Sequence, residues 1–307
     1  MEESTRSPIP PRIFLWCVPR SCSTVFTNFM SYIDGAEVWF EPFVVSWMNK
    51  FNWFDLIEKK EVGAAGKKIV EEVGASIPEE EWGNMRPLQT YSRYKWTKAE
   101  LEREPRNGQP NFIFIKDMAF AIDGHYEYLP EKVPCRHVFL IRHPHRFLYS
   151  YRPHSKMIAG CSPEEEYKHG DSDMLIQGGK CKDQIFELWK YVRENVDPNP
   201  IVMDTDDMLE NPGIILPQLF ARLSIPWKKS YLSWEGNGSI VKKWTACLEH
   251  FDRRINQGCF DRALYSTHFI PFEQPIPGMD DLHPDIATYV GKFMPGYEEM
   301  RKHVIQK

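Results

Sequence analysis

The chain has 307 residues, 42% of them apolar, and is long enough to bury a large core as one α/β domain. Its net charge of −5 and pI of about 6.1 disfavour a general nucleic-acid-binding protein, which needs a basic surface to neutralise phosphates. No run approaches the roughly 20 apolar residues that span a bilayer, and residues 1–11 contain no apolar signal core. We therefore expect a soluble, cytoplasmic protein without a nucleic-acid or membrane partner.

The seven cysteines are scattered along the chain without a compact framework. An odd number in a large chain favours reduced thiols of a cytosolic protein over structural disulfides. Cys17 and Cys22 lack the short Cys-x-x-Cys spacing of zinc ligands, and no second ligand pair follows them. We therefore expect no metal site.

Short apolar runs predict four buried strands, at residues 12–18, 111–117, 136–142 and 199–205. Helical or irregular segments separate these runs, which is typical of a three-layer α/β sandwich with a central, mainly parallel sheet. In such sheets, ligands bind beyond the carboxyl ends of the strands. Arg20, Lys116 and Arg142 lie at or just past these ends, so we expect them to converge.

The remaining segments predict additions to a single domain that covers residues 1–307. Residues 45–110, approximately, are charged with helical patches and indicate a helical insertion. Residues 152–183, approximately, are rich in glycine and proline with little periodicity, which favours a lid or acceptor-binding loop. Residues 285–304 predict an amphipathic helix that is interrupted near Pro295.

The stretch CVPRSCST, residues 17–24, joins an apolar run to a helix-like segment. A helix N-terminus exposes unpaired N–H groups and the positive end of the helix dipole, so its natural ligand is an anion. Compared with the P-loop pattern, Cys17 and Cys22 replace the glycines and Ser23 replaces the lysine, which disfavours an ordinary ATPase or GTPase. A simple helix N-cap made by these serines and threonine is the alternative interpretation.

A second segment, RHPHRFLYSY at residues 142–151, has the same strand-to-helix character. Arg142 ends a predicted strand, Pro144 opens a helix, and Ser150 follows about two turns later. This arrangement places Arg142 in front of a pocket shared with the first loop. The presence of both segments favours a binding site over a simple cap.

Together, PRSCST and this second segment resemble the two binding signatures of sulfotransferases that use 3′-phosphoadenosine-5′-phosphosulfate (PAPS). The resemblance covers roughly residues 12–45 and 111–226, and includes a strand with an acidic pair at 201–212. It implies a P-loop NTPase-like sulfotransferase fold, PAPS as donor and adenosine 3′,5′-bisphosphate (PAP) as product. It also implies that the first loop holds the 5′-phosphosulfate and that Arg142 and Ser150 hold the 3′-phosphate. The loop residues expected to bind the donor are Arg20, Ser21, Cys22, Ser23 and Thr24.

The chain departs from this family at two positions. Cys22 stands where family members usually have glycine, so its side chain either narrows the loop or requires a different backbone conformation. Met118 stands two residues after Lys116, where cytosolic members have a histidine base. Because methionine cannot accept a proton, the base must come from elsewhere.

Sulfuryl transfer resembles phosphoryl transfer, in which the protein mainly positions the reactants and stabilises charge. The resemblance implies that Arg20 and Lys116 are the cations near the leaving and transferred groups. Glu41 follows a strand-like run and precedes a proline, which favours an extended or turn backbone. In tyrosylprotein and several bacterial sulfotransferases, a glutamate at this distance after the loop arginine is the base, which implies that role for Glu41. The expected acceptor is a hydroxyl group of a small molecule or glycan.

Other side chains are rival or secondary candidates. Rivals for the base are His125, His143, His145 and His154. Adenine needs flat apolar faces, for which the candidates are Phe26, Trp234 and Trp244. Ser266 and Thr267 resemble a Ser-Thr pair of bacterial members, which implies contact with the nucleotide. Three carboxylates are predicted to hold a strand-to-helix turn through local hydrogen bonds: Asp204, Asp206 and Asp207.

Two further functions stay open at this point. Cys22 and Met118 leave room for a non-catalytic protein that binds adenosine bisphosphate. A P-loop kinase, which would bind ATP with Mg²⁺, fits the sequence less well, because the loop lacks the lysine.

Overall fold

The computed structural model describes residues 9–50, 93–103, 105, 109–158, 183–246 and 260–307. Within these residues, six strands form one sheet in the order β5-β4-β1-β3-β2-β6, and every neighbouring pair is parallel. The strands are β1 (Arg12–Cys17), β2 (Ala36–Phe40), β3 (Phe112–Met118), β4 (Cys135–Ile141), β5 (Ile201–Asp204) and β6 (Trp244–Ala246). The predicted α/β class with a central parallel sheet is confirmed.

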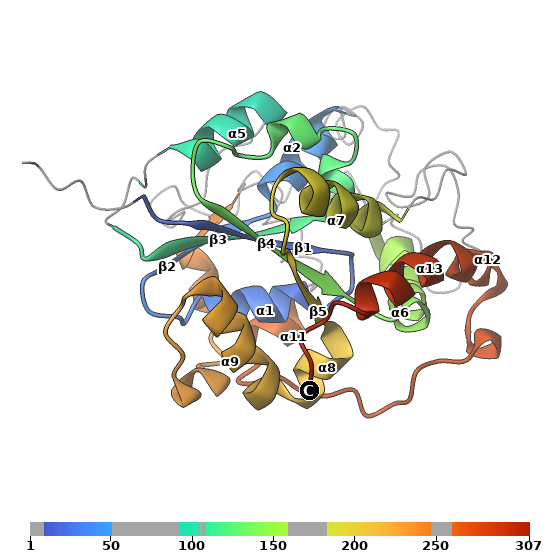
Figure 1. Cartoon of the computed structure of the whole chain (residues 1–307). Coiled ribbons are helices and arrows are strands. Elements are labelled where there is room, and N and C mark those ends of the chain that lie inside the picture. Colours follow the sequence, from blue (N-terminus) through green and yellow to red (C-terminus); the bar gives the residue numbers. More distant parts are fainter. Residues whose placement is uncertain (1–8, 51–92, 104, 106–108, 159–182, 247–259) are drawn as a thin grey trace, which may run out of the picture.

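Helices cover both faces of this sheet and make it the middle of three layers (Figure 1). One face carries α1 (Ser23–Met30), α8 (Thr205–Glu210), α9 (Pro212–Leu223) and α11 (Asp261–Leu264). The other carries α2 (Pro42–Lys50), α5 (Tyr94–Glu102), α6 (Pro144–Ile158), α7 (Gln184–Asn195), α12 (Pro284–Ala287) and α13 (Val290–Arg301). Short 3-10 turns are η3 (Ala119–Ile122), η4 (Tyr126–Tyr128), η6 (Lys229–Leu232), η7 (Gly238–Lys243) and η8 (Met279–Asp281).

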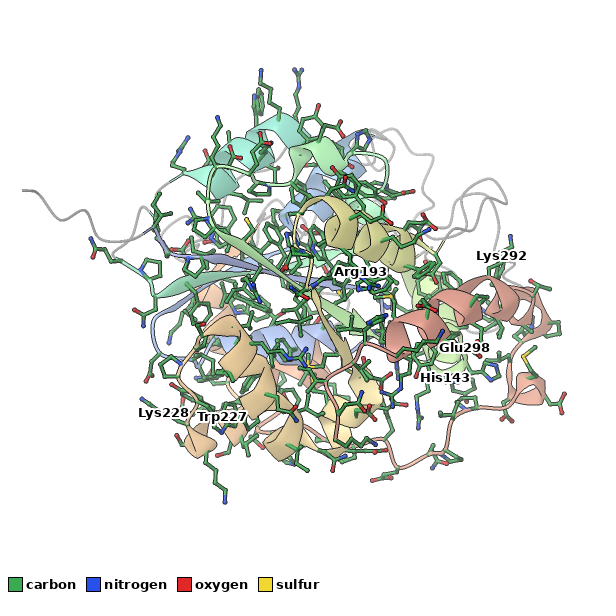
Figure 2. All side chains as sticks on the ribbon, in the orientation of Figure 1. His143, Arg193, Trp227, Lys228, Lys292 and Glu298 are labelled. Atoms are coloured by element: carbon green, nitrogen blue, oxygen red, sulfur yellow. The ribbon has the colours of Figure 1, made fainter. Side chains whose placement is uncertain are left out.

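The central strand β1 shows why the apolar runs form a sheet buried on both faces. Ile13 and Leu15 belong to the core on the α1 side, whereas Phe14 and Trp16 belong to the core on the α2 side. Successive side chains of a strand point to opposite faces, so an unbroken apolar run needs a cover on both. Side chains fill both spaces between sheet and helices (Figure 2).

The four predicted strands are confirmed as β1, β3, β4 and β5, and the strand-like run before Glu41 is β2. Strand β6 was not predicted, because three residues are too short to show a pattern. The irregular conformation predicted for the start of the lid is wrong for residues 152–158, which continue α6 through Pro153. A proline removes one intrahelical hydrogen bond, and a helix that is packed on the core tolerates this loss. Residues 159–182 of that lid and 51–92 of the predicted insertion lie outside the described residues.

The C-terminal helix differs from its prediction in the place of its break. The interruption lies between α12 and α13, at Thr288 and Tyr289, whereas α13 runs through Pro295 without ending. Buried Phe293 and Met300 lie on either side of that proline and hold the helix on the core. This packing offsets the loss of one backbone hydrogen bond.

Candidate active site

The loop between β1 and α1 presents an uncapped helix N-terminus. Cys22 is the N-cap residue of α1, but its side chain makes no capping hydrogen bond, and the first turn of α1 contains no acidic residue. Nothing within the described helix therefore neutralises the positive end of its dipole. The alternative interpretation, a side-chain cap on α1, is wrong, and the loop has the character of an anion site.

The backbone of this loop has the conformation that the family's glycine would favour. Cys22 has φ 59° and ψ 17°, and Arg20 has φ 62°, both in the left-handed region. Non-glycine residues are uncommon there, because Cβ approaches the following carbonyl oxygen at a cost of about 1–2 kcal/mol. The backbone at Cys22 therefore has the glycine-like conformation, with its steric strain, and not a different one.

We expect Cys22→Gly to raise the free energy of unfolding by about 1 kcal/mol, because glycine adopts this conformation without a steric cost. PAP affinity should change less than threefold, since the backbone already has the conformation of a glycine loop. Urea denaturation and calorimetric titration measure the two quantities. Ser224→Gly is the matched control, because Ser224 has φ 59° at the end of α9. A change in PAP affinity above tenfold for Cys22→Gly alone would show that the thiol itself shapes the site.

Ser21 supports the loop and is not among the residues that line the pocket, so its contact with the donor stays a prediction. Its Oγ donates to the carbonyl oxygen of Val18 at 2.7 Å, and the residue is fully buried. Its own carbonyl oxygen accepts from Thr205 Oγ1 at 3.1 Å, and that hydroxyl also contacts the Ile141 carbonyl oxygen at 2.8 Å. Thr205, which the sequence interpretation missed, thus ties the loop to the end of β4.

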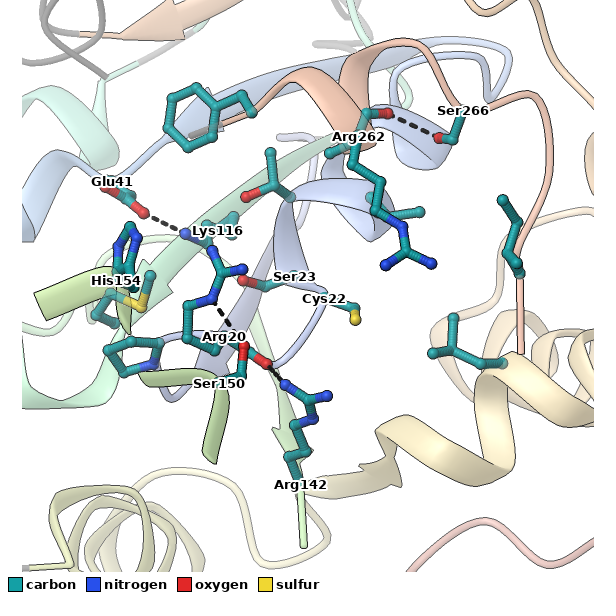
Figure 3. A pocket seen from close by; sticks show the side chains of 18 of the residues that line it. Arg20, Cys22, Ser23, Glu41, Lys116, Arg142, Ser150, His154, Arg262 and Ser266 are labelled. Atoms are coloured by element: carbon teal, nitrogen blue, oxygen red, sulfur yellow. Dashed lines mark hydrogen bonds and ion pairs between the residues drawn. The ribbon is translucent and has the colours of Figure 1, made fainter. Parts of the chain in front are cut away.

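The two predicted binding segments meet in one pocket. Arg20, Arg142 and Ser150 all line it (Figure 3). Arg20 Nε donates to Ser150 Oγ at 3.1 Å, and Arg142 Nη1 donates to the carbonyl oxygen of Arg20. Arg142 is 9% exposed, and within the described residues its buried Nε has no hydrogen-bond partner. The predicted convergence is confirmed, and one buried N–H donor of Arg142 is left for a ligand.

Lys116 and Glu41 form an ion pair in the same pocket (Figure 3). Their side chains are 1% and 6% exposed, and Lys116 Nζ lies 4.7 Å from the centroid of the Phe40 ring. The Glu41 backbone N–H donates to the Lys116 carbonyl oxygen at 2.8 Å, and Glu41 has φ 55°. Burying such an ion pair has a desolvation penalty that can exceed its electrostatic attraction, which favours a functional role over a stabilising one.

Residues after β6 complete the pocket in a way that the sequence interpretation largely missed. They are Phe260, Arg262, Ala263, Ser266, His268, Ile270 and Phe272. Among the described residues, Arg262 forms no ion pair or side-chain hydrogen bond, and it points toward the loop residues in Figure 3. In the sequence, only the closeness of Arg262 to Ser266, a predicted nucleotide contact, pointed to this segment. The Ser266 hydroxyl donates to the Ala263 carbonyl oxygen. Thr267 does not line this pocket.

Of the four histidine candidates, only His154 lines the pocket, on the side where Glu41 and Lys116 lie in Figure 3. His125 stacks on Tyr94, and His145 contacts the Pro277 carbonyl oxygen. His143 packs against Tyr297 of α13 and lies beside that helix in Figure 2. These three candidates are therefore wrong, since none of them lines the pocket.

The aromatic candidates for the nucleotide are core residues. Phe26, Trp234 and Trp244 all belong to the buried core on the α1 side of the sheet, and none lines the pocket. That prediction is wrong, because an aromatic-rich chain buries most of its rings. The ring of Phe272 does line the pocket, 4.6 Å from the guanidinium carbon of Arg142.

The acidic segment after β5 has the predicted structural role. Asp204 caps α8, because its Oδ1 accepts from the N–H groups of Asp206 and Asp207 at 2.9 and 3.2 Å. Asp206 pairs with Arg146 at 2.8 Å, and Asp207 pairs with Arg301 at 2.5 Å. The carboxylates of these three residues therefore bind partners within the fold.

No group of three or more histidine, cysteine, aspartate or glutamate side chains in the described part of the chain is arranged to hold a metal ion. No helix in the same residues has the length and apolar character to cross a membrane.

The structure is similar to solved structures of sulfotransferases. A sulfotransferase domain from the curacin biosynthetic pathway is 13% identical, with a TM-score of 0.42 over 94% of this chain and 99% of that one. A sulfotransferase domain of the Synechococcus PCC 7002 olefin synthase is 13% identical, with a TM-score of 0.40 over 94% and 96%. Retinol dehydratase in complex with androsterone and the inactive cofactor PAP is 16% identical, with a TM-score of 0.40 over 96% and 82%.

Similarities with TM-scores this low assign no activity to the chain. No family model and no curated protein matches the chain. The function therefore has to be inferred from the pocket itself.

Proposed function

We propose that the protein is a sulfotransferase that moves a sulfuryl group from PAPS to a hydroxyl group of a small molecule or glycan. One observation carries this proposal: Arg20 and Arg142, from two separate loops, line one pocket that also holds the buried Lys116–Glu41 pair. A nucleotide with phosphates at both ends needs cations at separate points, and a hydroxyl acceptor needs a base. The pocket supplies both.

The donor would bind along the two loops. The uncapped N-terminus of α1, with Arg20, Ser23 and Thr24, suits the 5′-phosphosulfate. Arg142, with its unpartnered buried Nε, and Ser150 suit the 3′-phosphate. Cys22 would contribute its backbone, because burial raises the pKa of its thiol despite the nearby Arg142 and Arg20.

The chemistry would be an in-line transfer between two oxygens. The bond from sulfur to the bridging oxygen of the donor breaks, a bond from sulfur to the acceptor oxygen forms, and the acceptor proton passes to Glu41. Arg20 and Lys116 would stabilise the charge that grows on the leaving 5′-phosphate. A general base of this kind contributes roughly 10² to 10⁴ in rate. The reaction as proposed uses no metal ion, and the proposed location is the cytoplasm.

Incubation with ³⁵S-labelled PAPS and a panel of phenols, alcohols and sugars tests the function. We expect labelled product and PAP, with a rate that is unchanged by EDTA. Tight PAP binding without any product would instead support the non-catalytic nucleotide-binding protein, which Met118 at the family's base position favours. Binding of ATP that depends on Mg²⁺ would support a kinase.

A further inference from the structure

Asp117 is a buried carboxylate next to Lys116 in β3, and the mechanism above does not use it. It is 0% exposed and does not line the pocket. Because successive residues of a strand point to opposite faces, Lys116 and Asp117 lie on different sides of the sheet. Lys116 meets the Glu41 side chain, whereas Asp117 meets the first turn of α2.

Glu41 occupies the N-cap position of α2. The helix begins at Pro42, and the Glu41 carbonyl oxygen accepts the first intrahelical hydrogen bond, from Val45 N–H at 3.3 Å. The side chain of an N-cap residue normally accepts from the second or third N–H group of its helix. In α2 these are the N–H groups of Phe43 and Val44.

Asp117 accepts both of these hydrogen bonds in place of Glu41. Phe43 N–H donates to Asp117 Oδ2 at 2.6 Å, and Val44 N–H donates to Asp117 Oδ1 at 3.2 Å. The cap of α2 thus comes from a strand far along the chain. The Glu41 carboxylate is left to pair with Lys116.

Capping α2 with the buried carboxylate of Asp117 is energetically unfavourable, and the helix could be capped without it. A carboxylate without solvent contact is unfavourable, and burial raises the pKa of Asp117 to about 8 although hydrogen bonds from Phe43 and Met118 lower it. An apolar residue on β3 with a self-capping residue at position 41 would close the same helix. The structure uses two acidic residues where one would cap.

We propose that Asp117 is a positioning residue: by capping α2 it keeps the carboxylate of Glu41 on Lys116 in the pocket. The role rests on the proposed function, because it matters for catalysis only if Glu41 accepts the acceptor proton. Without Asp117, the N–H groups of Phe43 and Val44 lack their acceptor, and the Glu41 carboxylate is the nearest replacement by position in the helix.

A double-mutant cycle tests this role. Asp117→Ala should lower sulfuryl transfer at least a hundredfold, and the same change in the Glu41→Gln background should lower it less than twofold. PAP affinity should stay at or above that of the unchanged protein, because Lys116 keeps its charge. A comparable loss in both backgrounds would overturn the proposal, since Asp117 would then act on the fold rather than through Glu41.

Asp183→Ala is the matched control, because Asp183 is also a helix cap, although a half-buried one: it accepts from Phe186 N–H at 3.3 Å at the start of α7. We expect it to lower the melting temperature and to change transfer less than twofold. If Asp117→Ala does not fold, Asp117→Asn keeps one acceptor oxygen. It should lower transfer about tenfold, again only when Glu41 is present.

A crystal structure of Asp117→Ala or Asp117→Asn separates this inference from the proposed function. The proposed function fails if the unchanged protein transfers no sulfuryl group. The positioning role is supported if the Glu41 carboxylate has moved to the N–H groups of Phe43 and Val44. It is overturned if that carboxylate remains on Lys116 while water bonds those groups.

Discussion

Replacing Arg20 by alanine is expected to weaken PAP binding at least tenfold and to lower sulfuryl transfer at least a thousandfold. Arg20 lines the pocket at the N-terminus of α1 and donates to Ser150 Oγ at 3.1 Å. A hydrogen bond to a charged group contributes about 1.5–3 kcal/mol, and tenfold in affinity corresponds to about 1.4 kcal/mol. An arginine on a transferring phosphoryl group contributes about 10³–10⁵ in rate, which sets the larger effect on transfer. Calorimetric titration and initial rates measure the two losses.

Arg152→Ala is the control for this change. Arg152 lies on α6 near Ser150, but it does not line the pocket, and its 20% exposed side chain pairs with Asp285 at 3.0 Å. Because this ion pair lies outside the pocket, binding and transfer should both change less than twofold. An Arg20→Ala protein with unchanged PAP affinity would contradict the donor site as proposed here.

The sheet could be predicted because its strands are buried on both faces and show as unbroken apolar runs, as in β1 and β3. Strand β6 could not be predicted, because its three residues show no pattern. Residues 152–158 were predicted as a loop, because Pro153 breaks a helix by propensity alone. Packing on the core outweighs that propensity in α6.

The site was predictable where it depends on strand ends. Arg20 and Arg142 come just after β1 and β4, and Lys116 lies near the end of the neighbouring parallel strand β3, so all three meet at the carboxyl ends of the strands. Arg262 was not predictable, because it comes from a separate segment after β6 that carries no motif. The aromatic predictions were wrong for a related reason: only the fold decides whether a ring such as Phe26 faces the core or the pocket.

Backbone conformation adds an observation about the site that no sequence pattern contained. Four non-glycine residues in the described part of the chain have positive φ: Arg20, Cys22, Glu41 and Ser224. The first three line the pocket, and the fourth ends α9. Strained backbone persists where the surrounding structure imposes it, and it gathers at functional sites. The strain thus marks the loop and the proposed base independently of any motif.

Glu41→Gln should separate catalysis from binding, because it removes a charge and keeps the shape of the side chain. Glutamine cannot take the acceptor proton, so we expect transfer to fall roughly 10²- to 10⁴-fold. PAP affinity should stay equal or rise, by up to about tenfold, because a carboxylate leaves a pocket built for an anion and Lys116 loses its competing partner. Initial rates and calorimetric titration measure the two effects.

The opposite signs of these two effects make the prediction specific, because general damage to the pocket would weaken binding and transfer together. Glu37→Gln is the matched control: Glu37 lies in β2, and its Oε1 accepts from Trp39 Nε1 at 2.6 Å outside the pocket. It should change neither quantity more than twofold. Full transfer by Glu41→Gln would assign proton acceptance to a histidine. His154 and His268 both line the pocket, and His154 lies on the side of Glu41 and Lys116 in Figure 3, which makes it the first candidate. Glu41 would then be only the counter-ion of Lys116. In that case His154→Gln, rather than Glu41→Gln, would abolish transfer.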